Sequence, residues 1–161
     1  MRTTVRRIIV LLALCAALAL AVVAQASGEE QLAPVWATIN VCDAGGNQVG
    51  ARVGVPGDGS DAQIYARFSV QWYSEKEGAW LPVQGVPNSP WLPVGSAALT
   101  MQQAGYTFQF DQPGDGRTKQ VRALAEVQWR EGATIVRSTS AGTQAGVPSD
   151  VGGSQASCAL S

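Results

Sequence analysis

The segment Ala62–Ser74, AQIYARFSVQWYS, alternates between apolar and polar side chains over its whole length. One face would carry the apolar side chains of Ile64, Ala66, Phe68, Val70 and Trp72, and the other would carry Tyr65, Arg67, Ser69, Gln71 and Tyr73. Successive side chains of a strand point to opposite sides of a sheet. The pattern therefore predicts a strand with one face in a core and the other toward solvent or a ligand.

Similar but shorter alternations flank this segment on both sides. They cover Pro34–Cys42, Val49–Val55, Trp80–Val83, Tyr106–Phe110, Val121–Trp129 and Thr134–Ser140. Clusters of Gly, Pro, Asn and Asp separate them at intervals of roughly 8 to 15 residues, and no long stretch has helical periodicity. We expect an all-β fold, an antiparallel immunoglobulin-like β-sandwich of about seven strands, with a small β-barrel as the alternative.

Three local expectations follow from this pattern. In the first strand, Val35, Ala37, Ile39 and Val41 should share one face, opposite Trp36 and Thr38. Pro82 cannot donate to a sheet, so its segment belongs to an edge or a bulge, and a Pro-rich loop should follow it. The Gly- and Ser-rich stretch Ala141–Ser157 should return along the domain, anchored only at Cys158.

The first 26 residues differ from the rest of the chain. Arg2, Arg6 and Arg7 precede the 16 apolar residues Ile8–Val23, and Ala24–Ala26 offers small residues for cleavage. This order predicts a secretory signal peptide over 1–26 and one β-sandwich domain over 27–161. The apolar stretch is shorter than the roughly 20 residues that span a bilayer, so we expect an extracellular protein without stable membrane insertion after cleavage. A retained anchor is the alternative.

Composition outside this leader limits the function. About 40% of those residues are apolar, which is enough for one packed core. That part of the chain has 8 basic and 12 acidic residues, which gives a net charge of −4. Proteins that bind nucleic acid use an excess of basic residues to neutralise its phosphates. This chain lacks such an excess, which argues against a nucleic-acid partner.

Two cysteines, Cys42 and Cys158, remain once the leader is removed. An even number in an exported chain indicates a disulfide, and only one pairing is possible. It would span 116 residues. A redox or metal-binding pair would need a CxxC spacing or histidine, and the sequence has neither.

The absence of histidine also removes the commonest general base and metal ligand. Ser-His-Asp and Cys-His catalysis are excluded, and we expect no catalytic residue, metal site or cofactor. A carboxylate pair remains as an alternative, drawn from Glu75, Glu77, Glu126 and Glu131. The plainer interpretation places Glu126 in a surface ion-pair ladder with Arg67, Arg122 and Arg130.

The tetrapeptide Trp-Leu-Pro-Val occurs twice, at Trp80–Val83 and Trp91–Val94. Two indoles therefore bracket one loop, and such rings stack on sugars, Pro-rich peptides or other apolar partners. The plainer interpretation is that both indoles close one end of the sandwich. Tyr65 and Tyr73, on the polar face of their strand, form a second candidate binding surface.

The segment Trp36–Asp43, WATINVCD, resembles the opening of uncharacterised secreted proteins of high-GC Gram-positive bacteria. Shared marks along the rest of the chain are Phe68–Trp72, Tyr106–Phe108, Val127–Arg130 and Ser154–Cys158. The resemblance implies a secreted β-sandwich-like domain with its two cysteines joined, and it implies no activity.

Together these observations predict a non-catalytic binding or structural module of the cell exterior. Its partner would be a glycan, the cell wall or another extracellular protein. One alternative is a carbohydrate- or cell-wall-binding module that uses Trp80 and Trp91. The other is an enzyme inhibitor presenting a rigid Pro82–Pro93 loop, or a small enzyme.

Overall fold

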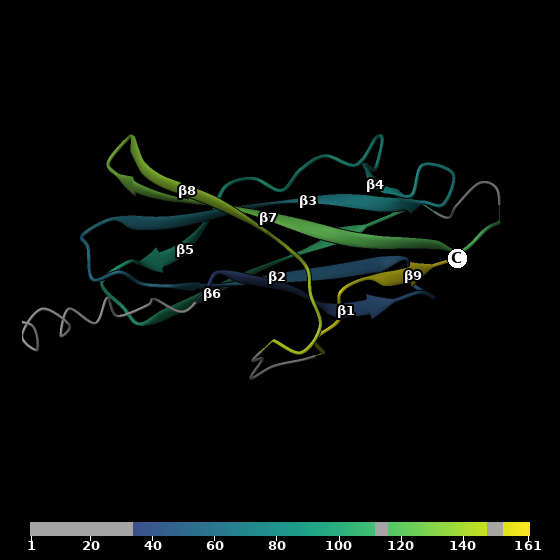
Figure 1. The fold of residues 1–161 in the computed structure, drawn as a ribbon, viewed down its shortest axis with the longest axis horizontal. Coiled ribbons are helices and arrows are strands. Elements are labelled where there is room, and N and C mark those ends of the chain that lie inside the picture. Colours follow the sequence, from purple (N-terminus) through teal and green to yellow (C-terminus); the bar gives the residue numbers. More distant parts are fainter. Residues whose placement is uncertain (1–33, 112–115, 148–152) are drawn as a thin grey trace, which may run out of the picture. The chain divides into compact units, whose positions relative to one another are not determined.

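The strands of the domain lie in two layers, with β1 and β2 beneath β3 and β7 in Figure 1. The computed structural model describes residues 34–111, 116–147 and 153–161. The chain divides into two units, residues 1–31 and 32–161, and the fold concerns the second. The leader over 1–26 and most of the Pro113–Gly116 turn lie outside the described residues.

Within the described ranges the structure has nine strands and no helix. The strands are β1 (Trp36–Asp43), β2 (Gln48–Pro56), β3 (Gln63–Ser74), β4 (Ala79–Pro82), β5 (Leu92–Ser96), β6 (Met101–Gln109), β7 (Lys119–Glu131), β8 (Thr134–Gly142) and β9 (Cys158–Leu160). A three-stranded sheet has the order β1-β2-β6. A six-stranded sheet has the order β4-β3-β7-β8, with β5 on β3 and β9 on β7. Their strand pairs are antiparallel.

This order confirms the predicted immunoglobulin-like sandwich. β1, β2 and β6 correspond to strands A, B and E of that fold, and β3, β7 and β8 correspond to C, F and G. In the part of the chain that the structure describes, the sheets stay separate and close no barrel.

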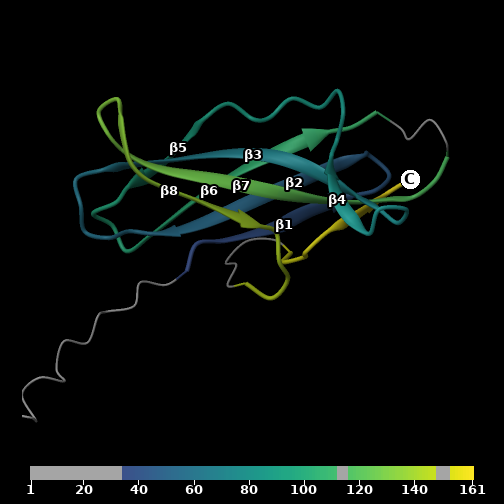
Figure 2. The same ribbon diagram turned by 45° about the horizontal axis from the view of Figure 1, so that its top comes forward.

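The core lies between the sheets, where the apolar faces of β2, β3 and β7 meet. Phe68 and Trp129 are the largest fully buried side chains in it. In β3 the even-numbered residues from Ile64 to Val70 are buried, so the odd-numbered ones face outward. Figure 2 turns this six-stranded layer toward the viewer.

All seven predicted strands are present, and the structure adds β5 and β9. The prediction missed β5 because it begins directly after the Pro-rich loop and contains Pro93. A proline is tolerated there because β5 lies at the edge of β3. The tail also has more anchors than Cys158, since Thr143 bridges to Ala37 and Gln155 bridges to Ile39.

The predicted face of β1 is wrong at Val41, near the end of the strand. A bulge leaves Asn40 without a partner between the Ile39–Ala51 and Val41–Gly50 pairs, so Val41 turns outward and is 39% exposed. Trp36 and Thr38, on the side opposite Ala37 and Ile39, are buried as well. The Trp36 indole covers Gly54, and Thr38 bonds Ser154 and Gln155 of the tail.

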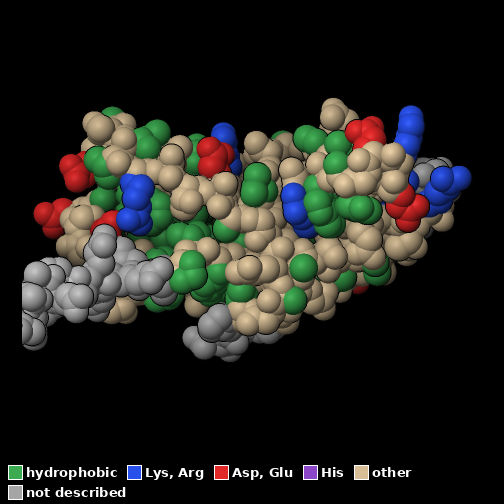
Figure 3. Space-filling view, in the orientation of Figure 1, with side chains coloured by type: hydrophobic (Ala, Val, Ile, Leu, Met, Phe, Trp, Pro, Cys, Tyr) green, Lys and Arg blue, Asp and Glu red, His purple; other side chains and the backbone are tan. Residues whose placement is uncertain are grey.

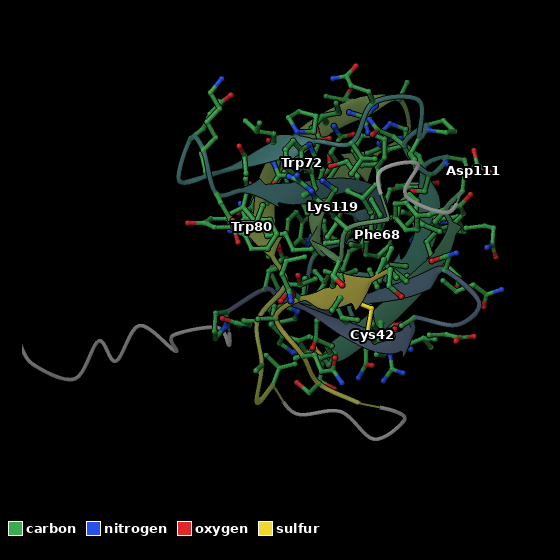
Figure 4. All side chains as sticks on the ribbon, turned by 90° about the vertical axis from the view of Figure 1, so that its right-hand side faces the viewer. Cys42, Phe68, Trp72, Trp80, Asp111 and Lys119 are labelled. Atoms are coloured by element: carbon green, nitrogen blue, oxygen red, sulfur yellow. A yellow bond between two sulfur atoms is a disulfide. The ribbon has the colours of Figure 1, made fainter. Side chains whose placement is uncertain are left out.

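The predicted disulfide is present between Cys42 and Cys158, whose Cα atoms are 5.4 Å apart (Figure 4). It joins the end of β1 in one sheet to the start of β9 in the other. Among the described residues, no helix is long and apolar enough to cross a membrane.

Candidate functional site

All four aromatic residues singled out in the sequence lie on the outer side of the six-stranded sheet. Tyr65 and Tyr73 are odd-numbered residues of β3, and Trp80 of β4 is paired directly with Tyr73. Pro93 of β5 is paired with Tyr65. Trp91 lies two residues before Pro93, so its side chain is on the same side of the sheet as those of Pro93 and Tyr65. We call this surface the aromatic face. It comprises Tyr65, Arg67, Gln71, Tyr73, Trp80, Trp91, Arg122, Glu126, Gln128 and Arg130.

One half of the aromatic face is built around Trp80. Its ring meets that of Tyr73 edge to face, with centroids 5.3 Å apart. The Arg122 guanidinium reaches from β7 and lies 4.5 Å from the Trp80 ring centroid. Its Nε donates to Gln71 Oε1 at 2.9 Å, which fixes the guanidinium over the ring.

The other half is built around Trp91. The guanidiniums of Arg67 and Arg130 lie 4.8 and 4.7 Å from the Trp91 ring centroid. Arg130 also lies 4.5 Å from the Tyr65 ring centroid and donates twice to Gln128 Oε1, at 3.0 and 2.7 Å. Cations and rings therefore alternate across the face.

The predicted ion-pair ladder forms at one position. Arg67 lies opposite Glu126 on the neighbouring strand and donates to its carboxylate at 2.7 Å. Arg122 and Arg130 instead bond the amide oxygens of Gln71 and Gln128. Burial lowers the pKa of the Arg122 guanidinium from its ordinary value. Three cations and one carboxylate thus make the face positive within an acidic chain.

The rings of this face remain accessible. Tyr73 is 38% exposed, and Tyr65, Trp80 and Trp91 are half-buried. In the space-filling view, Lys and Arg side chains stand among hydrophobic ones along the layer that contains β3 and β7 (Figure 3). Such a surface offers flat apolar platforms beside fixed hydrogen-bond donors, which suits a ring-shaped polar ligand.

Sequence reasoning missed the residue that holds the Trp91 loop. Ser89 is 3% exposed, and its Oγ accepts from the Phe68 amide at 2.8 Å and donates to the Pro90 carbonyl at 2.8 Å. The Ser89 amide donates to the Phe68 carbonyl. The loop is thus bonded to the edge of β3 just before Trp91. A lone serine among prolines carries no sequence signal for this role.

The alternative carboxylates do not gather on this face. Glu75, Glu77 and Glu131 are exposed in turns or at strand ends, and Glu126 is paired with Arg67. Within the described ranges, no group of three or more His, Cys, Asp and Glu side chains could hold a metal ion.

Comparison with protein-family models finds none that matches the chain, and comparison with curated proteins finds no relative.

Proposed function

We propose that this protein is a non-catalytic binding module of the cell exterior that recognises glycans through the aromatic face. The observation that carries the proposal is the convergence of Tyr65, Tyr73, Trp80 and Trp91 on one outer sheet face. Sugar rings present C–H groups that pack on aromatic rings and hydroxyls that bond side-chain donors, and this face supplies both.

The aromatic rings are held in fixed positions before any ligand is present, which supports the proposed glycan binding. Strand pairing fixes Tyr73 and Trp80, and the buried Ser89 fixes the loop before Trp91. Arg122 and Arg130 are held by glutamine side chains. Side chains ordered in advance lose less conformational entropy when a ligand binds.

Export to the cell exterior is part of the proposal. The predicted signal peptide supports it, and so does the Cys42–Cys158 disulfide, which suits an oxidising compartment. Mass spectrometry of the exported protein should show a chain shortened at the predicted cleavage site and lacking two thiol hydrogens.

Titration with neutral oligosaccharides tests the glycan proposal. Chito-, xylo- and cello-oligosaccharides are added to the disulfide-bonded protein while tryptophan fluorescence and heat of binding are recorded. We expect at least one series to bind. The Trp80→Ala, Trp91→Ala double variant should lose about tenfold or more in affinity, because two stacking platforms disappear.

Leu99→Ala is the matched control, because Leu99 is an apolar side chain, 55% exposed, outside the aromatic face. It should bind like the unmodified protein, and circular dichroism should show both variants folded. Binding that persists unchanged in the folded double variant, or no binding by any of the three series, would overturn the proposal.

A further inference from the structure

A cleft of about 470 Å³ opens where β3 and β7 separate. Pairing between these strands stops at Trp72 and Val121. Beyond that point β3 continues to Ser74 against β4, while β7 begins at Lys119 against β9. The cleft is lined by Trp72–Lys76 and by 117–120. Its volume is that of a site for a small molecule.

The charge of the cleft opposes the charge of the chain. Among the described residues that line it, three are cations, Lys76, Arg117 and Lys119, and one is a carboxylate, Glu75. Outside the leader, however, acidic residues outnumber basic ones by four. Arg117 and Lys119 already interact with other groups, so neither is an unpaired cation. An anionic ligand is favoured because cations outnumber carboxylates among the described lining residues.

The remaining walls are aromatic and polar. Trp72 is half-buried, and the Lys119 ammonium lies 5.4 Å from its ring centroid; Figure 4 shows the two side chains next to each other. Thr118 and Gln120 add exposed hydrogen-bonding groups. Ser74 Oγ accepts the Glu77 amide at 3.3 Å and so orders the turn that carries Lys76.

We propose that this cleft binds an acidic monosaccharide unit, a pyranose that carries a carboxylate. The carboxylate would face the three cations, the sugar ring would pack against the aromatic wall, and its hydroxyls would bond Thr118 and Gln120. A neutral sugar lacks the first of these interactions, and a bare phosphate lacks the second. The cleft adjoins the aromatic face and shares Tyr73 with it, but Trp80 and Trp91 do not line the cleft.

Isothermal titration calorimetry with D-galacturonate, D-galactose and inorganic phosphate tests this. We expect galacturonate to bind most tightly and to weaken between about 0.02 and about 0.5 M NaCl, because salt screens the cations. Lys76→Gln and Arg117→Gln should each weaken binding about threefold, and the double variant about tenfold. Arg52→Gln removes the same charge from the other sheet and should leave binding unchanged.

Three results would overturn the proposal. In the first, galactose binds as tightly as galacturonate does. In the second, phosphate binds as tightly as galacturonate does. In the third, the folded Lys76→Gln, Arg117→Gln variant keeps the full affinity for galacturonate. Trp91→Ala separates the two sites, since it should reduce binding of neutral oligosaccharides to the aromatic face while leaving galacturonate binding intact. Failure of either proposal is therefore visible without the other.

Discussion

Ser89 is a buried hydroxyl in a loop whose neighbouring residues Pro87, Asn88 and Pro90 are exposed. Its side chain meets both a backbone donor and a backbone acceptor, the Phe68 amide and the Pro90 carbonyl. A polar backbone group that is buried without a partner costs about 1–3 kcal/mol. The hydroxyl therefore stabilises the edge of β3 and positions the loop that leads to Trp91.

Replacing Ser89 by alanine removes only one hydroxyl group, yet it should lower the stability of the fold. Ser89→Ala leaves the Phe68 amide without its side-chain acceptor, and we expect the free energy of unfolding to fall by about 1–3 kcal/mol in urea titration. Ser138→Ala, on the exposed strand β8, should change it by less than about 0.5 kcal/mol. Equal, small effects of the two substitutions would show that the Ser89 bonds contribute nothing net.

The strand β8 is exposed over most of its length. Residues 134–140 are exposed, including Ile135 and Val136. The Arg137 guanidinium lies 3.5 Å from the Trp129 ring centroid and pairs with Asp58, in the loop after β2, at 3.2 Å. This ion pair connects the β7–β8 hairpin of the six-stranded sheet to the loop after β2 of the three-stranded sheet.

Acid should weaken this tie. The Ser60 hydroxyl, which donates to Asp58 at 2.6 Å, and the Arg137 charge hold the pKa of Asp58 below its ordinary 3.8. A lowered pKa in the folded state means that the carboxylate stabilises the fold above pH 3.8, and that this stabilisation is lost as the pH falls through the folded value.

Asp58→Asn should therefore unfold at a lower temperature than the unmodified protein at neutral pH, and the difference should vanish well below pH 3.8. Melting curves followed by circular dichroism across this range measure it. Asp61→Asn, an exposed neighbour, serves as the control. A difference that stays constant with pH would assign the effect to packing rather than to the carboxylate charge.

On the scale of the whole molecule, the tail joins the two sheets. The backbones of Gln144, Gly153 and Gln155 bond β1, the Thr143 amide bonds Ala123 of β7, and β9 pairs with β7. The Cys42–Cys158 bond spans 116 residues between these sheets. Closing so long a loop restricts the unfolded chain more than the folded one.

Removal of the disulfide should produce the largest stability change. The Cys42→Ser, Cys158→Ser double variant should lose about 4–5 kcal/mol of unfolding free energy in urea. A reducing agent should lower the stability of the unmodified protein by a similar amount and should leave the double variant unaffected. Unaltered unfolding midpoints in both experiments would contradict this account.

Much of the aromatic face was predictable because a strand has period two. The alternation in 62–74 assigned Tyr65 and Tyr73 to the outer side before any partner was known. The same alternation placed Arg122, Glu126 and Arg130 together on one side of their strand. It could not show that Arg122 and Arg130 stack on Trp80 and Trp91, because that depends on which strands are neighbours and in what register.

The sequence by itself determined the all-β class, the seven main strands and the outward sides of β3 and β7. Together with the predicted cleavage of the leader, which holds Cys15, it also predicted the Cys42–Cys158 pairing. Those properties depend on local alternation, turn residues and composition, which are visible within a few residues. Only the tertiary structure decided the bulge at Asn40, the strands β5 and β9, the role of Ser89 and the cleft beside Lys119. Each of these depends on hydrogen bonds or spacing between segments far apart in the chain, and no local pattern encodes such partners.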